Sequence, residues 1–129
     1  GFATSLMGFA SSYSNTGDIL LIGKNKKSMQ QAYREVRKMN GGIVIAEDEK
    51  IICSIELPIG GVLSKKSVEE LIEEELVLKR ELATRGFKHG DAIYTLLFLQ
   101  ATHLPYVRIT QRGIFDVMKK QVLFPALMR

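Results

Sequence analysis

Histidine and cysteine, the side chains that most often hold catalytic metals or act as nucleophiles, are scarce in this 129-residue sequence. Its two histidines, His89 and His103, stand fourteen positions apart and form neither a His-x-His nor a His-Glu-x-x-His motif. Because a hydrolytic metal site needs several ligands around one ion, we predict no metal site in this chain. We expect His89 in an exposed turn and His103 at a helix end.

The single cysteine, Cys53, follows two isoleucines in an apolar run. A reactive thiol needs an electropositive, partly exposed setting, so we expect Cys53 to be a core residue rather than a nucleophile. One cysteine also excludes an internal disulfide framework and fits a reducing compartment. We therefore predict a cytoplasmic protein.

The polar loop 11–18, with the sequence SSYSNTGD, lies between two apolar runs and concentrates short hydrogen-bonding side chains. Such side chains can recognise a polar heterocycle, which makes Ser14, Asn15, Thr16 and Asp18 candidates for a substrate-proximal site. The simpler interpretation is a turn in which Asn15 and Asp18 bond their own backbone. The residues alone leave both interpretations open, with the turn as the default.

Two other polar or glycine-rich segments have structural interpretations. The acidic residues between 69 and 75 alternate with leucine and isoleucine, which is typical of the solvated face of a helix rather than of a cation site. The glycine pairs at 41–42 and 60–61 lack the spacing of phosphate-binding loops, so we expect them in turns. Neither segment predicts chemistry.

Length and composition indicate one folded domain over residues 1–129. A content of 46% hydrophobic and 25% charged residues gives no reason to expect disorder. The net charge is +4, but no basic stripe is interleaved with aromatic residues, so we predict no nucleic-acid binding. The longest apolar runs are far shorter than the ~20 residues of a membrane span, and we predict no membrane partner.

The first half of the sequence predicts strands around one helix. Runs at 6–10 and 18–23 have strand length, and the second is apolar throughout, as in a strand covered on both faces. Ser28 and Gln31 have capping-box spacing before a helix that we expect to end at the Asn40-Gly41-Gly42 stop. Residues 43–46 and 50–57 predict a β-hairpin.

The second half predicts two helices and two edge strands or extended tails. Ser67 and Glu70 form a capping box, Gly86 stands at the helix end, and we expect an inward set of Val68, Leu71, Ile72, Leu76, Leu78 and Leu82. Asp91 can cap a helix over 92–99 that is apolar almost all round, so we expect it to be buried and closed by Pro105. The tails are 106–110 and 121–127.

This order of elements predicts an α+β fold with a largely antiparallel sheet backed by about three helices. Short phrases along the chain also follow one another in a characteristic order: FASS at 9–12, ILLIG at 19–23, Asn25 with Met29, GGIV at 41–44, LPIGGVLS at 57–64 and RITQRGIFDV at 108–117. In this order they resemble the C-terminal domain of bacterial adenine deaminases. The resemblance covers nearly the whole chain.

The resemblance implies a parent enzyme of the amidohydrolase superfamily that converts adenine and water to hypoxanthine and ammonia. Its catalytic residues and its divalent metal, manganese or iron, would belong to an N-terminal (β/α)8 barrel, so it implies no catalytic residue and no cofactor in this chain. The implied role is structural: to pack on that barrel, cover the active site or contribute to a homodimer. The start at Gly1, without a methionine, fits such a fragment.

One departure from the family pattern falls in the polar loop. Many members carry His-Asp-Ser-His-Asn there, whereas this chain, aligned on the strand that follows, has the sequence SNTGD at 14–18 and neither histidine. Two alternatives follow from this difference. The parent could act on a different amino-substituted heterocycle, or the chain could be a non-catalytic module that binds a small molecule or a protein.

Overall fold

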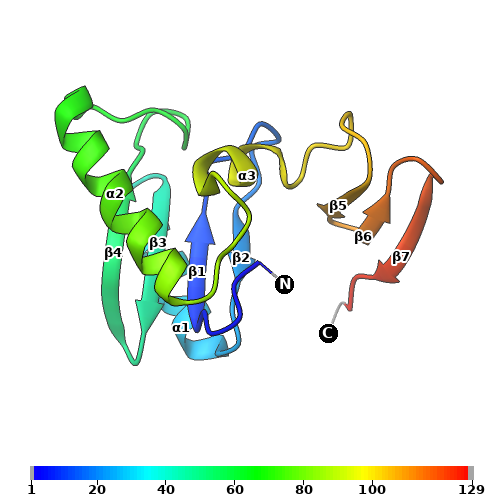
Figure 1. Cartoon of the computed structure of the whole chain (residues 1–129), viewed down its shortest axis with the longest axis horizontal. Coiled ribbons are helices and arrows are strands. Elements are labelled where there is room, and N and C mark those ends of the chain that lie inside the picture. Colours follow the sequence, from blue (N-terminus) through cyan, green and yellow to red (C-terminus); the bar gives the residue numbers. More distant parts are fainter. Residues whose placement is uncertain (1, 128–129) are drawn as a thin grey trace.

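The computed structural model describes residues 2–127, which form a four-stranded sheet flanked by helices and a three-stranded sheet to one side (Figure 1). The larger sheet has the order β2-β1-β3-β4 and the smaller one β5-β6-β7, and all pairings are antiparallel. The elements are β1 (Gly8–Ser11), β2 (Leu20–Ile22), α1 (Lys26–Lys38), β3 (Gly42–Glu47), β4 (Lys50–Glu56), α2 (Val68–Thr84), α3 (Ala92–Phe98), β5 (Val107–Thr110), β6 (Gly113–Asp116) and β7 (Gln121–Pro125). The predicted α+β class is confirmed.

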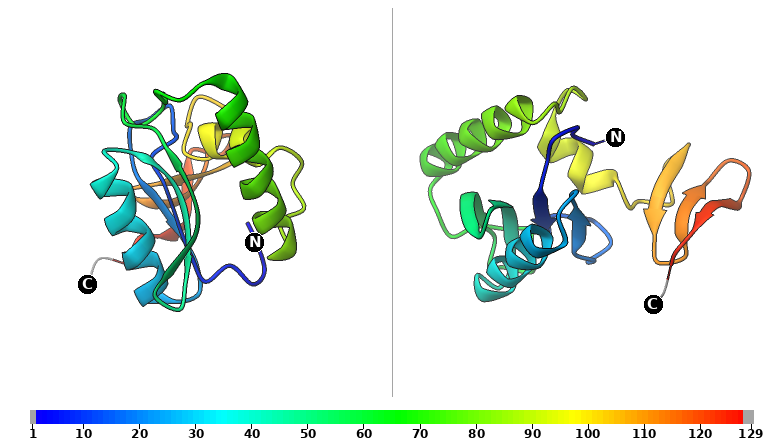
Figure 2. Two further views of the ribbon diagram at one scale, coloured as in Figure 1. Left: turned by 90° about the vertical axis from the view of Figure 1, so that its left-hand side faces the viewer. Right: turned by 90° about the horizontal axis from the view of Figure 1, so that it is seen from below.

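Helix α1 covers one face of the larger sheet and α2 and α3 cover the other, and the central strands β1 and β3 are buried between them (Figure 2). Successive side chains of a strand point to opposite faces, and the two cores follow this alternation. Phe9 and Ile45 pack in the core beneath α2 and α3, while their neighbours Ala10 and Val44 pack against α1. The smaller residues thus lie on the α1 side.

Helix α1 begins three residues earlier than the capping-box spacing predicts. Asn25 is the N-cap: its side-chain oxygen accepts a 3.0 Å hydrogen bond from the Ser28 amide, and its own amide donates to the Met7 carbonyl at 3.0 Å. Ser28 is a buried residue inside the helix, so its predicted role as the cap is wrong. The predicted stop is confirmed, because Asn40 follows the helix with a φ of 60°.

Both ends of α2 are as predicted. Ser67 and Glu70 form the capping box, with the Ser67 hydroxyl accepting from the Glu70 amide at 3.3 Å and the Glu70 carboxylate accepting from the Ser67 amide at 2.9 Å. At the other end Gly86 has a φ of +86°, and the Phe87 amide donates to the Leu82 carbonyl at 3.0 Å. These are the features of a Schellman motif, in which glycine tolerates the left-handed backbone.

The predicted inward face of α2 is only half correct. Leu78 and Leu82 are fully buried, but Val68, Ile72 and Leu76 are 67%, 50% and 61% exposed. At 100° per residue these three side chains lie on an adjoining face of the helix, one third of a turn from the buried one. The straight helix covers the sheet with a narrow strip only, so the second apolar strip faces solvent.

Helix α3 and strand β2 are less buried than their apolar sequences predict. Asp91 caps α3 as predicted, accepting from the Tyr94 amide at 2.8 Å, but the helix ends at Phe98, well before Pro105. Tyr94 is 67% exposed, because α3 is short and contacts the sheet through one face. β2 is an edge strand whose Leu21 is 44% exposed, so the prediction of cover on both faces is wrong.

The hairpin of β3 and β4 is confirmed, and Asp48 and Glu49 turn it with φ values of 46° and 65°. The segment after α3 contains one more strand than predicted, since β6 pairs with both β5 and β7. Strand β7 ends at Pro125, whose nitrogen cannot donate a ladder hydrogen bond. Within residues 2–127 no helix has the length and apolar character needed to cross a membrane.

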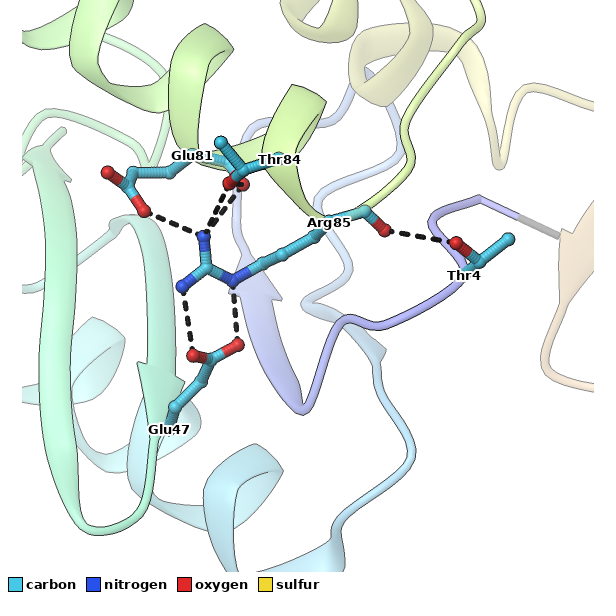
Figure 3. Close-up of polar contacts among 5 residues, drawn as sticks. All are labelled: Thr4, Glu47, Glu81, Thr84 and Arg85. Atoms are coloured by element: carbon cyan, nitrogen blue, oxygen red, sulfur yellow. Dashed lines mark hydrogen bonds and ion pairs between the residues drawn. The ribbon is translucent and has the colours of Figure 1, made fainter.

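Arg85 ties the C-terminal end of α2 to the central hairpin (Figure 3). Its guanidinium pairs with both carboxylate oxygens of Glu47 and, through Nη1, with Glu81 at 2.7 Å. The hydrogen bond from Arg85 holds the pKa of Glu47 below its ordinary value, and the two carboxylates raise the pKa of Arg85. Thr4 adds a 3.4 Å hydrogen bond to the Arg85 carbonyl.

Candidate functional site

The polar loop 11–18 lies at one end of the larger sheet, beside α3 (Figure 1). Its base is fixed by Ser12, whose hydroxyl donates to the Gly61 carbonyl and accepts from the Gly42 amide, both at 2.8 Å. Gly42 and Gly61 belong to two of the phrases that carry the family resemblance. Those phrases therefore hold the loop in place.

Gly61 is required by this arrangement. It has a φ of +78°, and a Cβ at this position would lie 3.1 Å from the Ser12 hydroxyl oxygen. A larger residue would strain the backbone and displace the serine. The glycine pair at 60–61 is thus a turn, as the sequence predicts, and also the contact surface for the loop.

Within the loop, serine side chains form the turn. The Ser14 hydroxyl is buried, lies 2.9 Å from the Thr16 hydroxyl and accepts from the Thr16 amide at 3.2 Å. Ser11 likewise accepts from the Tyr13 amide at 3.1 Å. The sequence predicts that Asn15 and Asp18 would bond the nearby backbone. Among the hydrogen bonds of the described residues, Ser11 and Ser14 have this role instead. Ser14 is therefore engaged in shaping the loop.

Residues 16 and 18 of the loop face the β5–β6 hairpin across a pocket of about 410 Å³ that has both polar and apolar lining. Asp18 accepts a 3.5 Å hydrogen bond from Gln111, which lies in the turn of that hairpin. Asn15 is exposed, and its amide donates to the Leu97 carbonyl at 3.3 Å. The residues that line the pocket are Thr16, Asp18, Gln100, Thr102, Ile109, Thr110, Gln111, Arg112 and Phe115.

Two of the four candidate residues, Thr16 and Asp18, therefore line the pocket, whereas Ser14 is turned into the loop and Asn15 is absent from the lining. Sequence reasoning missed Gln100 and Arg112. Arg112 could have been found from its place in the phrase at 108–117, but Gln100 follows α3 with no distinguishing signal.

The pocket offers both hydrogen-bond donors and acceptors, including the Arg112 guanidinium and the Asp18 carboxylate. The amide oxygen of Gln100 is shielded from solvent and accepts no hydrogen bond within the described part of the chain. An acceptor that is shielded from solvent is also out of reach of a ligand in the pocket, so the Gln100 side chain forms part of the wall. Apolar contacts come from Ile109 and Phe115. The arrangement suits binding of a small polar ring.

The other residues considered for chemistry lie apart from this pocket. His89 packs edge-on against Phe87, with ring centroids 5.5 Å apart, and His103 is exposed in the segment between α3 and β5 rather than at a helix end. Cys53 lies half-buried on β4, and burial raises the pKa of its thiol to about 11. Among residues 2–127, no three metal-ligating side chains come together.

Comparison with known proteins identifies relatives along the whole chain. A family model described as the adenine deaminase C-terminal domain matches residues 1–121. The chain is 54% identical over its full length to "Putative adenine deaminase YerA" of Bacillus subtilis, covering 22% of that protein. It is 33% identical over 106 residues to "Adenine deaminase" of Thermosipho africanus. This match spans 82% of this chain and 18% of the relative.

The chain therefore spans about a fifth of the length of these relatives. The matched region includes the polar loop, the phrases at 41–44 and 57–64 that hold it, and the β5–β6 hairpin on the far side of the pocket. With the family model covering more than nine tenths of its residues, this chain belongs to the adenine deaminase C-terminal domain family.

Proposed function

We propose that residues 1–129 form a single domain, the C-terminal domain of an adenine deaminase-like, metal-dependent amidohydrolase. The observation that carries the proposal is the family match over residues 1–121, together with relatives named as adenine deaminases that are about five times longer. In the parent protein the reaction would be adenine plus water to hypoxanthine plus ammonia. This domain would complete or stabilise the enzyme rather than carry the hydrolytic step.

A divalent metal ion, manganese or iron, held by the N-terminal part of the parent would activate the water that attacks the purine carbon bearing the amino group. The residues of this chain would contact the substrate rather than the metal ion. We propose that Ser14, Asn15, Thr16 and Asp18 lie near the substrate, with Ser14 shaping the loop and Asp18 accepting a hydrogen bond from an amino or ring N–H group. The fixed base of the loop at Ser12 supports this role.

A second candidate function is favoured by the pocket between the loop and the β5–β6 hairpin. Its lining combines hydrogen-bonding side chains, among them Asp18 and Arg112, with the apolar side chains of Ile109 and Phe115. The pocket could therefore bind an amino-substituted heterocycle other than adenine, either as a substrate of the parent or without any catalysis. The absence of histidine from residues 14–18 also supports a substrate different from that of other family members.

We further propose a bacterial, cytoplasmic parent that acts in purine catabolism as a homodimer and has no nucleic-acid partner. A bacterial origin is supported by the relative in Bacillus subtilis. A dimer contact is supported by the smaller sheet, on which Phe124 and Val107 are exposed. The half-buried thiol of Cys53 fits a reducing compartment.

The proposal is tested by ammonia release from adenine, with Mn(II) added, for the full-length parent and for the parent ended just before Gly1. We expect activity that collapses on truncation. In the full-length protein, Asn15→Ala combined with Asp18→Ala is expected to lower kcat/KM by at least about tenfold, while Gln30→Ala on the exposed face of α1 leaves it unchanged.

Two results would contradict parts of this proposal. An unchanged kcat/KM in the double variant would remove the loop from the substrate site. A metal-loaded parent without activity on adenine would point instead to another amino-substituted heterocycle. The same assay would then be run with cytosine, guanine and an aminopteridine.

A further inference from the structure

The apolar stripe of α2, formed by Val68, Ile72 and Leu76, is not used by the core of this domain. Its residues are spaced four apart, so their side chains lie along one face of the helix, and all three are exposed. We propose that this stripe is the surface on which the domain docks against the N-terminal portion that its longer relatives carry. The inference rests on the proposed place of this chain in a longer protein and not on catalytic activity.

The stripe belongs to a rigid element. Helix α2 has seventeen residues, is capped by Ser67 and closed at Gly86, and is held at its C-terminal end by the ion pair of Arg85 with Glu47. An exposed apolar strip on a rigid helix is a feature of protein–protein contact surfaces. The strip is therefore preorganised for docking.

A hollow beside the stripe adds shape to this surface. It has a volume of about 240 Å³ and lies between α2, α3 and the phrase at 57–64. Leu63 lines it and is itself exposed, while Leu71, Ile93 and Tyr13 form its apolar walls. An apolar side chain of the partner could fill this hollow while neighbouring residues of the partner pack against the stripe.

The length of the relatives identifies the occupant of the stripe. About four fifths of each long relative lies outside the region matched by this chain, so the remaining portion is present in the same polypeptide at a high effective concentration. The exposed charged residues Glu69, Glu73 and Arg80 form a rim of both signs beside the stripe, as is usual around an apolar contact surface.

The experiment compares thiol accessibility at two neighbouring positions of α2. Ile72→Cys and Glu73→Cys are made separately in the 129-residue chain and in the full-length parent, and alkylation of each is followed by peptide mass spectrometry. Both positions are exposed in this domain, and their side chains point 100° apart around the helix. Cys53 gives little background, because burial raises its pKa to about 11.

We expect both thiols to react at similar rates in the 129-residue chain. In the parent, the thiol at 72 should react at least about tenfold more slowly, since alkylation needs an accessible thiol, and the thiol at 73 should change much less. Equal rates at 72 in the two proteins would overturn the proposal. Equal protection at 72 and 73 would overturn the assignment to this face of the helix.

Two further outcomes separate this inference from other possibilities. Protection at 72 that rises with the concentration of the 129-residue chain, together with a dimer in analytical ultracentrifugation, would identify a second copy as the partner and overturn the proposed one. Protection at 72 in a parent without deaminase activity would support the docking surface while the proposed function fails. As a second variant, Ile72→Glu with Leu76→Glu should leave the melting temperature of the 129-residue chain unchanged and make the parent sensitive to proteolysis.

Discussion

Arg85 and Glu47 form a bidentate ion pair in which Nε lies 2.6 Å from Oε1 and Nη2 lies 2.9 Å from Oε2. The pair joins the residue after α2 to the end of β3, thirty-eight positions away in the sequence. The Arg85 side chain is only 12% exposed, so its charge depends on the carboxylates around it. This single contact fixes one end of the helix that carries the apolar stripe.

Replacement of Arg85 by leucine should lower the free energy of unfolding by about 2–3 kcal/mol, because Glu47 and Glu81 would lose their shared cationic partner. The measurement is urea unfolding followed by circular dichroism. Lys38→Ala is the control, since Lys38 pairs with Glu35 through a side chain that is 76% exposed, and its loss should cost less than about 0.5 kcal/mol. Similar losses in the two variants would contradict a structural role for the Arg85 network.

The same pair predicts a dependence of stability on pH. The hydrogen bond from Arg85 lowers the pKa of Glu47 below its unfolded value of about 4.3, so the folded protein is stabilised by the ionised form. That contribution is complete above the unfolded pKa and is lost as the pH falls through the lower, folded one. Glu47→Gln should therefore be destabilising at pH 7 and approach the native protein in stability below about pH 4. A gap that stays constant between these pH values would show that the pKa of Glu47 is not linked to folding.

A pair of adjacent glycines tests the contact that fixes the polar loop. Gly61→Ala places a methyl group about 3.1 Å from the Ser12 hydroxyl at a φ of +78°, whereas Gly60→Ala at a φ of +63° has no neighbour within 4 Å. Both substitutions carry the backbone cost of a left-handed residue, about 1 kcal/mol, and only the first displaces Ser12. We expect Gly61→Ala to lose about 1 kcal/mol more in thermal unfolding than Gly60→Ala. Equal losses of stability in the two variants would mean that Ser12 can move away from the added methyl group at no cost.

The sequence predicts best where structure depends on neighbouring residues. The cap and stop of α2, the cap of α3 by Asp91 and the β3–β4 hairpin are each decided within a few residues, and each is confirmed. Burial depends on what covers an element and is less predictable. The sequence shows which residues of α2 are apolar, but it does not show which of them contact the sheet. Leu78 and Leu82 are buried and Ile72 is not, because the sheet lies beneath only one side of the helix.

The same distinction applies to the candidate site. The polar loop is visible in the sequence because its short side chains are contiguous. The pocket is not, because Asp18 and Gln111 meet across ninety-three positions. Gln100 becomes a site residue only through the turn that follows α3, which places it beside the β5–β6 hairpin. Strand β6 was missed for a related reason, since its four residues acquire their pairing from strands on both sides.

The start of α1 offers a test of why one local prediction is wrong. Asn25 and Ser28 are both residues that favour an N-cap, and they stand three positions apart. The Asn25 amide is already fixed by its hydrogen bond to the Met7 carbonyl, so the chain enters the helix at Lys26 and Ser28 donates to the cap instead of forming one. Asn25→Ala should therefore cost about 1 kcal/mol in urea unfolding, the typical value of a lost cap.

Ser28→Ala is the matched variant. Its backbone amide remains to donate to Asn25, and alanine is the better helix former, so we expect a change within about 0.5 kcal/mol. The helix signal in circular dichroism should stay the same for this variant at low urea. A larger loss for Ser28→Ala than for Asn25→Ala would place the cap at Ser28 and would shorten α1 by its first turn.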